Sequence, residues 1–351
     1  MNSIMWKYID EEPSCIEKLL NSKEVLDAAA NVIDYDALYF VAHGSSYNAA
    51  ITVHDFFSRV TGKRAYAYTP SSFINSCFSL NVEKKPLVVA ISETGTSRGL
   101  IEAVEHAEKE KISVLSITDT ANSPIEKLGT YVLHMQCGKE DSNAKTKGYT
   151  NTLVALILLA TEIGYKLGKI SDTDKTEIRN EIAGCANQIP SLKNLVLSRM
   201  KELNFGRNLT CLYVLGSGMN YGTAMEGQLK MMETMCVPTA FNDIGEFSHG
   251  MHRSVSNKID SIVIDTGTDH IDAIKAWNFL CDAGRSSILI TSDDSYSGNN
   301  VINISRCKFT NSVLLTTLVI QVISVFTPEN NGLDPNRPSH NELTETMETR
   351  V

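Results

Sequence analysis

The sequence predicts an α/β protein made of two copies of one strand–helix unit, because three short loops occur twice in its 351 residues. Each loop recurs at an offset of about 173 residues, which indicates an internal duplication. Each also follows a run expected to be a strand and precedes an expected helix, the edge where open α/β sheets bind ligands. The pairs are Ala42–Tyr47 with Gly216–Tyr221, Thr94–Thr96 with Thr266–Thr268, and Ile117–Asp119 with Ile290–Ser292.

The first unit follows residues 1–30, which are expected to be helical with a break at Pro13. The run Pro86–Ile91 is almost wholly apolar, as in a parallel strand that is covered on both faces. The other strands are expected at Leu38–Val41, Ile112–Ile117 and Tyr131–Met135, and the helices from about Ala49, over Leu100–Lys111 and over Thr152–Leu167.

The second unit follows a charged segment, residues 168–206, which lacks strand-like runs and is expected to be a helical connection. Residues 313–326 are apolar but too short to span a bilayer, so we expect a buried helix. The polar tail Thr327–Val351 holds three prolines and is expected to be an extended arm. The remaining strands are expected at Leu212–Leu215, Ser261–Ile264 and Ser287–Ile290, and the helices over Thr223–Cys236 and Ile271–Ala283. The expected domains are residues 1–27, 28–168, 169–205, 206–326 and 327–351.

Composition indicates a globular protein, with 42% hydrophobic and 21% charged residues. A net charge of −9 argues against nucleic-acid or anionic-membrane partners, which require a basic surface. Most of the eight cysteines lie in apolar contexts and are expected to be buried thiols in a reducing cytosol. They include no C-x-x-C pair, so they are not expected to be metal ligands. The start of the chain shows no signal-peptide pattern, and we expect a cytoplasmic protein.

The turn Ser92–Ser97 is the best candidate for binding phosphate. It places four hydroxyl side chains and a glycine between a buried strand and the start of a helix. Free N–H groups and the helix dipole favour a dianion there. Ordinary helix capping by serine and threonine is the alternative, although one hydroxyl is enough for a cap. Ser45 and Ser46 in the neighbouring loop add weight to the phosphate site.

Two stripes run along the helix expected at Thr223–Cys236. The stripe of Glu226, Lys230 and Glu233 fits a solvated ladder of salt bridges. It also fits a catalytic set in which Lys230 holds an oxygen and Glu233 takes a proton from a carbon beside a carbonyl or imine. His249 lies in a further loop, between a serine and a glycine, and belongs to such a set only if it meets Glu233 in space. The stripe expected to face the core consists of Met225, Leu229, Met232 and Cys236.

These motifs resemble the double sugar-isomerase (SIS) domain family, in particular the isomerase half of glucosamine-6-phosphate synthase and the fructosamine 6-phosphate deglycases. The resemblance runs from about Met5 to Phe326 and depends on the hydroxyl turn, the Glu226–Glu233 helix and the Glu246–Gly250 loop. It implies two tandem SIS domains, each a three-layer αβα sandwich of flavodoxin-like type. It also implies a sugar-phosphate substrate and no cofactor or metal.

The resemblance assigns a role to individual residues. The counterpart of Glu233 moves a proton between C1 and C2, that of Lys230 assists it, and that of His249 opens the sugar ring from the partner subunit of a homodimer. The implied substrate-binding residues are Ser45, Ser46, Ser92, Glu93, Thr94, Ser97, Asn143 and Lys145. Glu93 stands where the family has glutamine, and Asn143 and Lys145 stand where it has a Val-x-Ser pair.

Two departures from the synthase shape the expected function. We expect no amidotransferase domain and hence no glutaminase activity, because Asn2 stands where the synthase has its catalytic cysteine. In addition, Glu345 falls near the arm lysine that reaches the sugar carbonyl in the synthase. Both departures favour a substrate that already carries nitrogen, from which the enzyme releases the amine as a deglycase or deaminase. A plain aldose–ketose isomerase and a sugar-phosphate sensor without catalysis are the alternatives.

Overall fold

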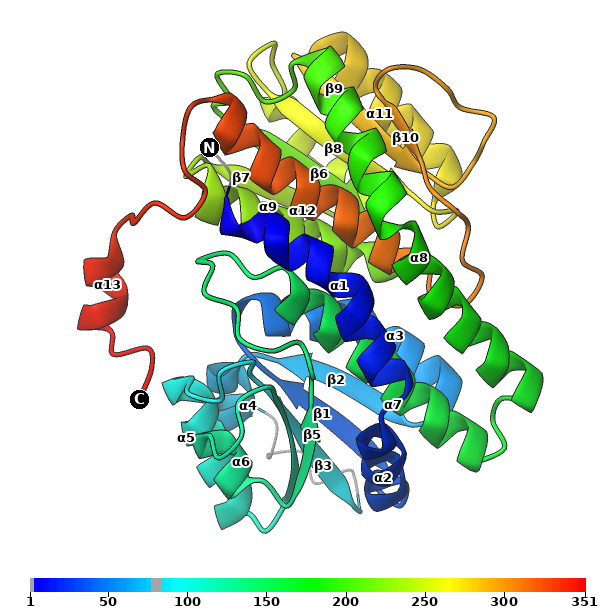
Figure 1. Ribbon diagram of the computed structural model, residues 1–351, viewed down its shortest axis with the longest axis vertical. Helices are drawn as coiled ribbons and strands as arrows, with labels where there is room; N and C mark the ends of the chain where they lie inside the picture. Colours follow the sequence, from blue (N-terminus) through cyan, green and yellow to red (C-terminus); the bar gives the residue numbers. More distant parts are fainter. Residues whose placement is uncertain (1–2, 77–83) are drawn as a thin grey trace. The chain divides into compact units, whose positions relative to one another are not determined.

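The computed structural model describes residues 3–76 and 84–351, so Cys77 lies outside the described residues. The chain forms two compact units, each built on its own sheet (Figure 1). The first-sheet unit comprises Ser14–Glu140, Lys147–Ala183 and Pro338–Val351, and the second-sheet unit comprises Met1–Pro13, Asp141–Thr146 and Gly184–Arg337.

The first-sheet unit holds five parallel strands in the order β2-β1-β3-β4-β5, the flavodoxin-like order. In the centre, Tyr39 pairs with Tyr66 on one side and Val88 on the other. The predicted strands are confirmed, whereas β2 was missed because its sequence alternates charged, small and aromatic residues. The strands are β1 (Ala37–Val41), β2 (Arg64–Tyr68), β3 (Pro86–Ile91), β4 (Ser113–Thr118) and β5 (Tyr131–His134).

Helices cover both faces of this sheet and complete the predicted three-layer αβα unit. On one face, Val88 and Ala90 of β3 share a buried cluster with Leu100 of α5. On the other face, the rings of Phe40 in β1 and Phe57 in α3 lie 5.3 Å apart. The helices are α2 (Lys23–Val32), α3 (Gly44–Thr61), α4 (Pro70–Ser76), α5 (Arg98–Lys109), α6 (Pro124–Leu128) and α7 (Lys147–Lys166).

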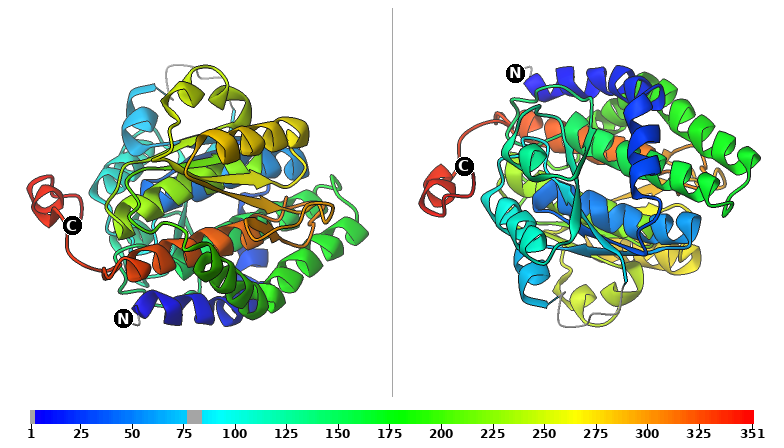
Figure 2. Two further views of the ribbon diagram at one scale, coloured as in Figure 1. Left: turned by 90° about the horizontal axis from the view of Figure 1, so that it is seen from above. Right: turned by 90° about the horizontal axis from the view of Figure 1, so that it is seen from below.

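The second-sheet unit repeats this architecture, which confirms the duplication. Its parallel strands lie in the order β10-β9-β8-β6-β7, the order of the first sheet read from the opposite edge. Helices lie on both faces of this sheet (Figure 2). On one face Leu280 of α11 joins the buried cluster, and on the other Gly227 of α9 lies close to Val214 of β6 and Ile320 of α12. The strands are β6 (Leu212–Gly216), β7 (Thr239–Asn242), β8 (Asp260–Asp265), β9 (Ser286–Thr291) and β10 (Val301–Asn303), and the helices are α9 (Met219–Thr234), α10 (Ile244–Phe247), α11 (His270–Ala283), α12 (Val313–Asn330) and the 3-10 helix η2 (Met251–Ser254).

Two long helices contribute residues to both units. They are α1 (Ile4–Leu20) and α8 (Asp172–Leu203), the latter confirming the predicted helical connection. The predicted break at Pro13 is wrong, because α1 runs through it. A proline removes one helical N–H donor, and the rest of the helix remains hydrogen-bonded. The first break comes instead at Ser22, whose hydroxyl caps α2 by accepting the N–H of Glu24 at 3.2 Å.

Several helices begin earlier than their apolar periodicity predicts. Gly44 and Gly218 adopt φ values of +56° and +58°, so the chain turns from strand into helix within a few residues. The first turn of α3 is largely polar and therefore gives little apolar signal. As a result Ser45 and Ser46 lie inside the first turn of α3 rather than in a loop. The observed starts are Gly44 for α3, Lys147 for α7 and Met219 for α9, against Ala49, Thr152 and Thr223 expected.

The last core helix, α12, is buried as predicted. Among the described residues it alone is long and apolar enough to cross a membrane, and 89% of it is buried inside the structure, as in the core of a globular protein. It extends past the predicted end at Phe326 to Asn330. The tail is not wholly extended, because it contains the short helix α13 (Asn341–Thr346).

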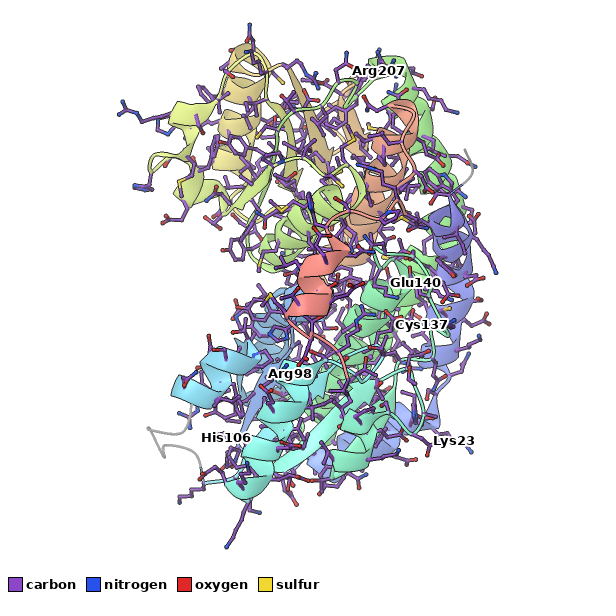
Figure 3. All side chains as sticks on the ribbon, turned by 90° about the vertical axis from the view of Figure 1, so that its left-hand side faces the viewer. Lys23, Arg98, His106, Cys137, Glu140 and Arg207 are labelled. Carbon is purple, nitrogen blue, oxygen red and sulfur yellow. The ribbon has the colours of Figure 1, made fainter. Side chains whose placement is uncertain are left out.

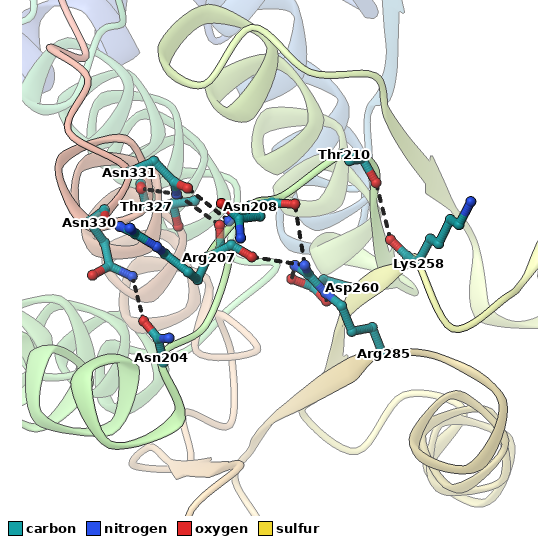
Figure 4. A network of polar contacts seen from close by, with 11 residues as sticks. Asn204, Arg207, Asn208, Thr210, Lys258, Asp260, Arg285, Thr327, Asn330 and Asn331 are labelled. Carbon is teal, nitrogen blue, oxygen red and sulfur yellow. Dashed lines mark hydrogen bonds and ion pairs between the residues drawn. The ribbon is translucent and has the colours of Figure 1, made fainter.

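A polar network at the start of β8 ties the second-sheet unit together (Figure 4). Asp260 is fully buried and receives two hydrogen bonds from the guanidinium of Arg285, one of them at 2.6 Å from Nε. The same guanidinium donates from Nη1 to the carbonyls of Arg207 and Asn208 at 2.8 and 3.3 Å. Arg285 therefore neutralises a buried carboxylate. It also joins the sheet to the segment between α8 and β6, which contains Arg207 and Asn208.

The substitution Arg285→Met is expected to lower the free energy of unfolding by about 2 kcal/mol, because it leaves the Asp260 carboxylate buried without its donor. Urea unfolding followed by circular dichroism measures the change. Lys275→Met is the matched control, since its pair with Asp272 is exposed and worth little. A loss no larger than that of the control would contradict the role assigned to Arg285.

Candidate active site

The hydroxyl turn Ser92–Ser97 joins β3 to α5 in a conformation that requires a glycine at position 95. Gly95 has φ +66°, and a Cβ there would lie 2.2 Å from Oγ of Ser123, so no other residue fits. Its N–H donates to Oγ of Ser92 at 3.1 Å. The turn is thus a tight, preformed loop at the carboxyl end of the sheet.

The hydroxyl groups of the turn are not used to cap α5. Ser97 is the N-cap residue but makes no side-chain cap hydrogen bond, and its Oγ lies 3.4 Å from Nδ1 of His43. The hydroxyls of Thr94 and Thr96 lie 3.0 Å apart. Burial lowers the pKa of His43, which favours the neutral ring at pH 7. The capping alternative therefore does not account for this turn.

The two hydroxyl-bearing loops of this unit lie side by side. Ser45 and Ser46 follow β1, the turn at Ser92 follows β3, and these two strands are neighbours in the sheet. In a sheet of this order the chain changes direction between β1 and β3, and ligands bind at that switch point. The predicted phosphate-binding residues of the first copy thus gather at one place.

The end of the chain pairs with the hydroxyl turn (Figure 3). The carbonyl of Thr349 accepts the N–H of Arg98 at 3.1 Å, and the N–H of Val351 donates to the carbonyl of Thr96 at 3.0 Å. Glu348 accepts a hydrogen bond from Nη1 of Arg98 at 2.8 Å. The tail therefore takes up an N–H donor at the start of α5, and the sequence carries no signal for this pairing.

The charged stripe of α9 is buried, so its interpretation as a solvated ladder is wrong. Nζ of Lys230 has no exposed surface around it and lies 2.6 Å from Oε2 of Glu233 and 3.3 Å from Oε1 of Glu226. Glu226 is itself buried, whereas the Glu233 side chain is 28% exposed. One ammonium thus serves two carboxylates, of which only Glu233 is open to a ligand.

The prediction that Met225, Leu229, Met232 and Cys236 form the core face of α9 is correspondingly wrong. Met232 is 43% exposed, and Cys236 lies beyond the end of the helix at Thr234. Small residues, Ala224 and Gly227, are buried on this helix together with Lys230, and Gly227 lies close to the side chains of Val214 and Ile320. Apolar periodicity failed here because the helix buries its charges.

His249 lies just after α10 and is exposed. Among the described residues of its unit, no hydrogen bond or ion pair joins it to Glu233. A cavity of about 360 Å³ opens beside its loop, lined by Phe247, Ser248, His252 and Phe279. The loop therefore presents both a free imidazole and an apolar recess to whatever approaches it.

The predicted site residues divide between the two units. The first-sheet unit holds Ser45, Ser46, Ser92, Glu93, Thr94 and Ser97, and the second-sheet unit holds Asn143, Lys145, Lys230, Glu233 and His249. The structure brings together the hydroxyl loops in one unit and the Lys230 set in the other. Asn143 precedes α7, and its N–H donates to Oδ1 of Asn336 at 3.0 Å.

Comparison with known proteins gives a consistent result. Residues 32–162 match the SIS domain family. A glutamine–fructose-6-phosphate aminotransferase (isomerizing) of Shouchella clausii is 26% identical over 359 residues, covering 98% of this chain but only 58% of that protein. The chain thus spans less than two thirds of the length of this relative, and the match confirms the resemblance drawn from the motifs.

Two solved structures share the fold over nearly the whole chain. A candidate phosphosugar isomerase of Clostridium difficile 630 has a TM-score of 0.91 at 22% identity and covers 100% of this chain and 99% of its own. A glucosamine-6-phosphate deaminase of Thermotoga maritima has a TM-score of 0.79 at 19% identity, covering 96% and 98%. At these identities the likeness establishes the tandem αβα fold.

Proposed function

Because the chain contains a SIS domain at residues 32–162 and repeats that fold in its second half, we propose that it is a phosphosugar isomerase-type enzyme. Its substrate is an amino-sugar phosphate or a sugar–amine 6-phosphate adduct. The observation that carries the proposal is the buried Lys230, which holds the accessible carboxylate of Glu233 at 2.6 Å. Burying this charge cluster is costly and favours a catalytic role.

In the proposed reaction Glu233 removes a proton from C1 or C2 of the open-chain substrate. The electrons move toward the imine or carbonyl, giving an enolamine, and Glu233 returns the proton to the neighbouring carbon. Water then adds to the resulting imine carbon and the amine leaves, so that a hexose 6-phosphate remains. Lys230 keeps Glu233 ionised and stabilises the charge that develops. The chemistry uses no metal or redox cofactor.

The other residues bind the substrate and open its ring. Ser45, Ser46 and the hydroxyl turn bind the phosphate at the switch point of the first sheet. His249 opens the ring from a second copy of the chain, which makes the enzyme a homodimer. Its exposed position, with no contact to Glu233 within its own unit, is what such sharing requires.

Amine release is preferred over plain isomerisation because of Glu345, an acidic residue in the tail where the synthases have an amine-bearing lysine. The plain isomerase and the catalytically inactive sensor are the competing functions. A turnover panel separates the three. It contains fructose 6-phosphate with ammonia, glucosamine 6-phosphate and several fructosamine 6-phosphates, with detection of hexose phosphate and free amine.

The outcomes of the panel are distinct. Amine released from one adduct class establishes the deglycase or deaminase and identifies the substrate. Interconversion of hexose phosphates without an amine establishes the isomerase. No turnover, combined with thermal stabilisation by the sugar phosphates, supports the sugar-phosphate sensor and rejects the proposal that the protein is an enzyme.

Removal of residues 348–351 is expected to raise the affinity for hexose 6-phosphates about 3-fold to 10-fold. The truncation frees the N–H of Arg98, a helix N-terminal donor that the Thr349 carbonyl now occupies. Isothermal titration calorimetry measures the change, with Glu342→Gln in the exposed part of the tail as the control. An unchanged or weakened affinity would show that the tail and the phosphate do not compete.

A further inference from the structure

Glu93 is fixed by its main chain within the hydroxyl turn. Its carbonyl accepts the N–H of Asp119 at 2.9 Å and the hydroxyls of Thr118 and Thr120 at 3.1 and 3.4 Å. This residue therefore joins the turn after β3 to the loop after β4. Its backbone has little freedom to move, so the position of its Cβ is fixed as well.

The carboxylate of Glu93 lies against the first turn of α7. A Cβ built on Gly148 would be 2.3 Å from Oε2 of Glu93 and 3.3 Å from Oε2 of Glu140. Glu140 also accepts the N–H of Gly148 at 3.0 Å. Two carboxylates thus meet at the N-terminus of a 20-residue helix, where the helix dipole stabilises negative charge. A side chain at position 148 would therefore displace the Glu93 carboxylate from this place.

Cys137, a buried thiol, lies near Glu140 on the same side of the unit (Figure 3). Burial raises the pKa of Cys137, and the carboxylates of Asp119, Glu93 and Glu140 raise it further. The N–H of Cys137 donates to Oδ1 of Asp119 at 2.9 Å, so this loop also contacts the residue that the Glu93 carbonyl holds. Glu93 belongs to this structural cluster.

The second copy of the fold contains the same arrangement with a smaller side chain. Asp265 precedes Thr266-Gly267-Thr268 as Glu93 precedes Thr94-Gly95-Thr96. The carbonyl of Asp265 accepts the N–H of Ser292 at 3.1 Å, as that of Glu93 accepts the N–H of Asp119. The carboxylate of Asp265 is buried and accepts from Thr291 and from the N–H of Gly267 at 2.9 and 3.1 Å. In that copy the acidic side chain holds the loops of its own fold.

We propose that Glu93 is a positioning residue, which holds the hydroxyl turn against the first turn of α7 and does not itself contact the sugar phosphate. Gly148 is the specificity-determining partner that admits its carboxylate. The identity of the ligand as a sugar phosphate rests on the proposed function. A carboxylate aimed at the dianion would repel it, whereas one packed on α7 keeps the hydroxyl groups in place.

A double-mutant cycle between positions 93 and 148 tests the proposal in the full chain. Affinities for fructose 6-phosphate, glucosamine 6-phosphate and inorganic phosphate are measured by calorimetry. Glu93→Ala and Gly148→Ala are each expected to weaken sugar-phosphate binding about 10-fold. Gly148→Ala is expected to cost nothing further in the Glu93→Ala background, because the clashing carboxylate is gone. Gly184→Ala, at a helical glycine with nothing within 4 Å, is the control and leaves affinity unchanged.

Glu93→Gln separates positioning from direct contact without relying on the folding of Gly148→Ala. The isosteric amide is expected to keep affinity for sugar phosphates and inorganic phosphate within about 3-fold. A 10-fold or larger gain in affinity would place the carboxylate beside the dianion and overturn the proposal. Additive effects of Glu93→Ala and Gly148→Ala would overturn it as well.

Thermal unfolding of the same variants tests the positioning role of Glu93 independently of the proposed function. If the wild-type protein binds none of the sugar phosphates, the proposed function fails. The coupling between positions 93 and 148 is then still measured in the melting temperature. Non-additive melting shifts support the positioning role, and additive shifts reject it.

Discussion

Replacing Glu233 by glutamine is expected to lower turnover by about 10³-fold, while the dissociation constant for hexose 6-phosphates changes by less than about 3-fold. The amide keeps the shape of the side chain and its contact with Lys230 but cannot accept the proton. Steady-state kinetics on the substrate found in the turnover panel, together with calorimetry, measure the two quantities separately.

The matched control for this variant is Glu202→Gln, on an exposed face of α8 where Glu202 pairs with Arg199. It is expected to leave turnover and binding unchanged. Turnover by Glu233→Gln at the wild-type rate would remove Glu233 from the mechanism. An equal loss of turnover and of binding would indicate that the residue only shapes the site.

The substitution Lys230→Met is expected to lower the free energy of unfolding by about 3–5 kcal/mol and to abolish turnover. The ammonium has no solvent exposure, and its removal takes a cation 3.3 Å away from the buried Glu226 carboxylate. Methionine fills a similar volume, so the cost arises from charge rather than from a cavity. Urea unfolding measures the stability difference.

A compensating variant tests whether the cost is electrostatic. Lys230→Met combined with Glu226→Gln removes the stranded charge and is expected to regain at least half of the lost stability. Turnover is expected to stay absent in the double variant, because Glu233 still lacks its cation. Failure to regain stability would show that Lys230 contributes through packing.

Apolar runs predicted the sheets well and the helix starts poorly. The strand Pro86–Ile91 was predicted to the residue because a strand covered on both faces must be apolar throughout. The edge strands β2, β7 and β10 were missed, because β2 and β7 bury only part of their side chains and β10 is only three residues long. The first turn of α3, Gly44–Tyr47, is largely polar, and the first turn of α9 has Met219 as its one strongly apolar residue, so neither gave a periodic apolar signal.

The types and spacing of the residues identified the candidate site, but they could not predict whether its side chains are buried. The spacing of Glu226, Lys230 and Glu233 shows that they share one side of a helix, and it says nothing about whether that side faces solvent. Burial depends on the small residues Ala224 and Gly227 and on α12, more than 80 residues further along the chain. The role of Gly148 depends likewise on a contact with Glu93 that no local pattern encodes.

The repeated fold gives the two halves of the chain different evolutionary freedom. In the second copy the carboxylate of Asp265 already accepts the N–H of Gly267 and the hydroxyl of Thr291, and α9 supplies the buried Lys230 set instead. On the proposed function, one copy anchors the substrate and its sister performs the chemistry. Mutations that change which phosphorylated compound is held can then accumulate in the first half while the proton-transfer apparatus of the second half is inherited intact.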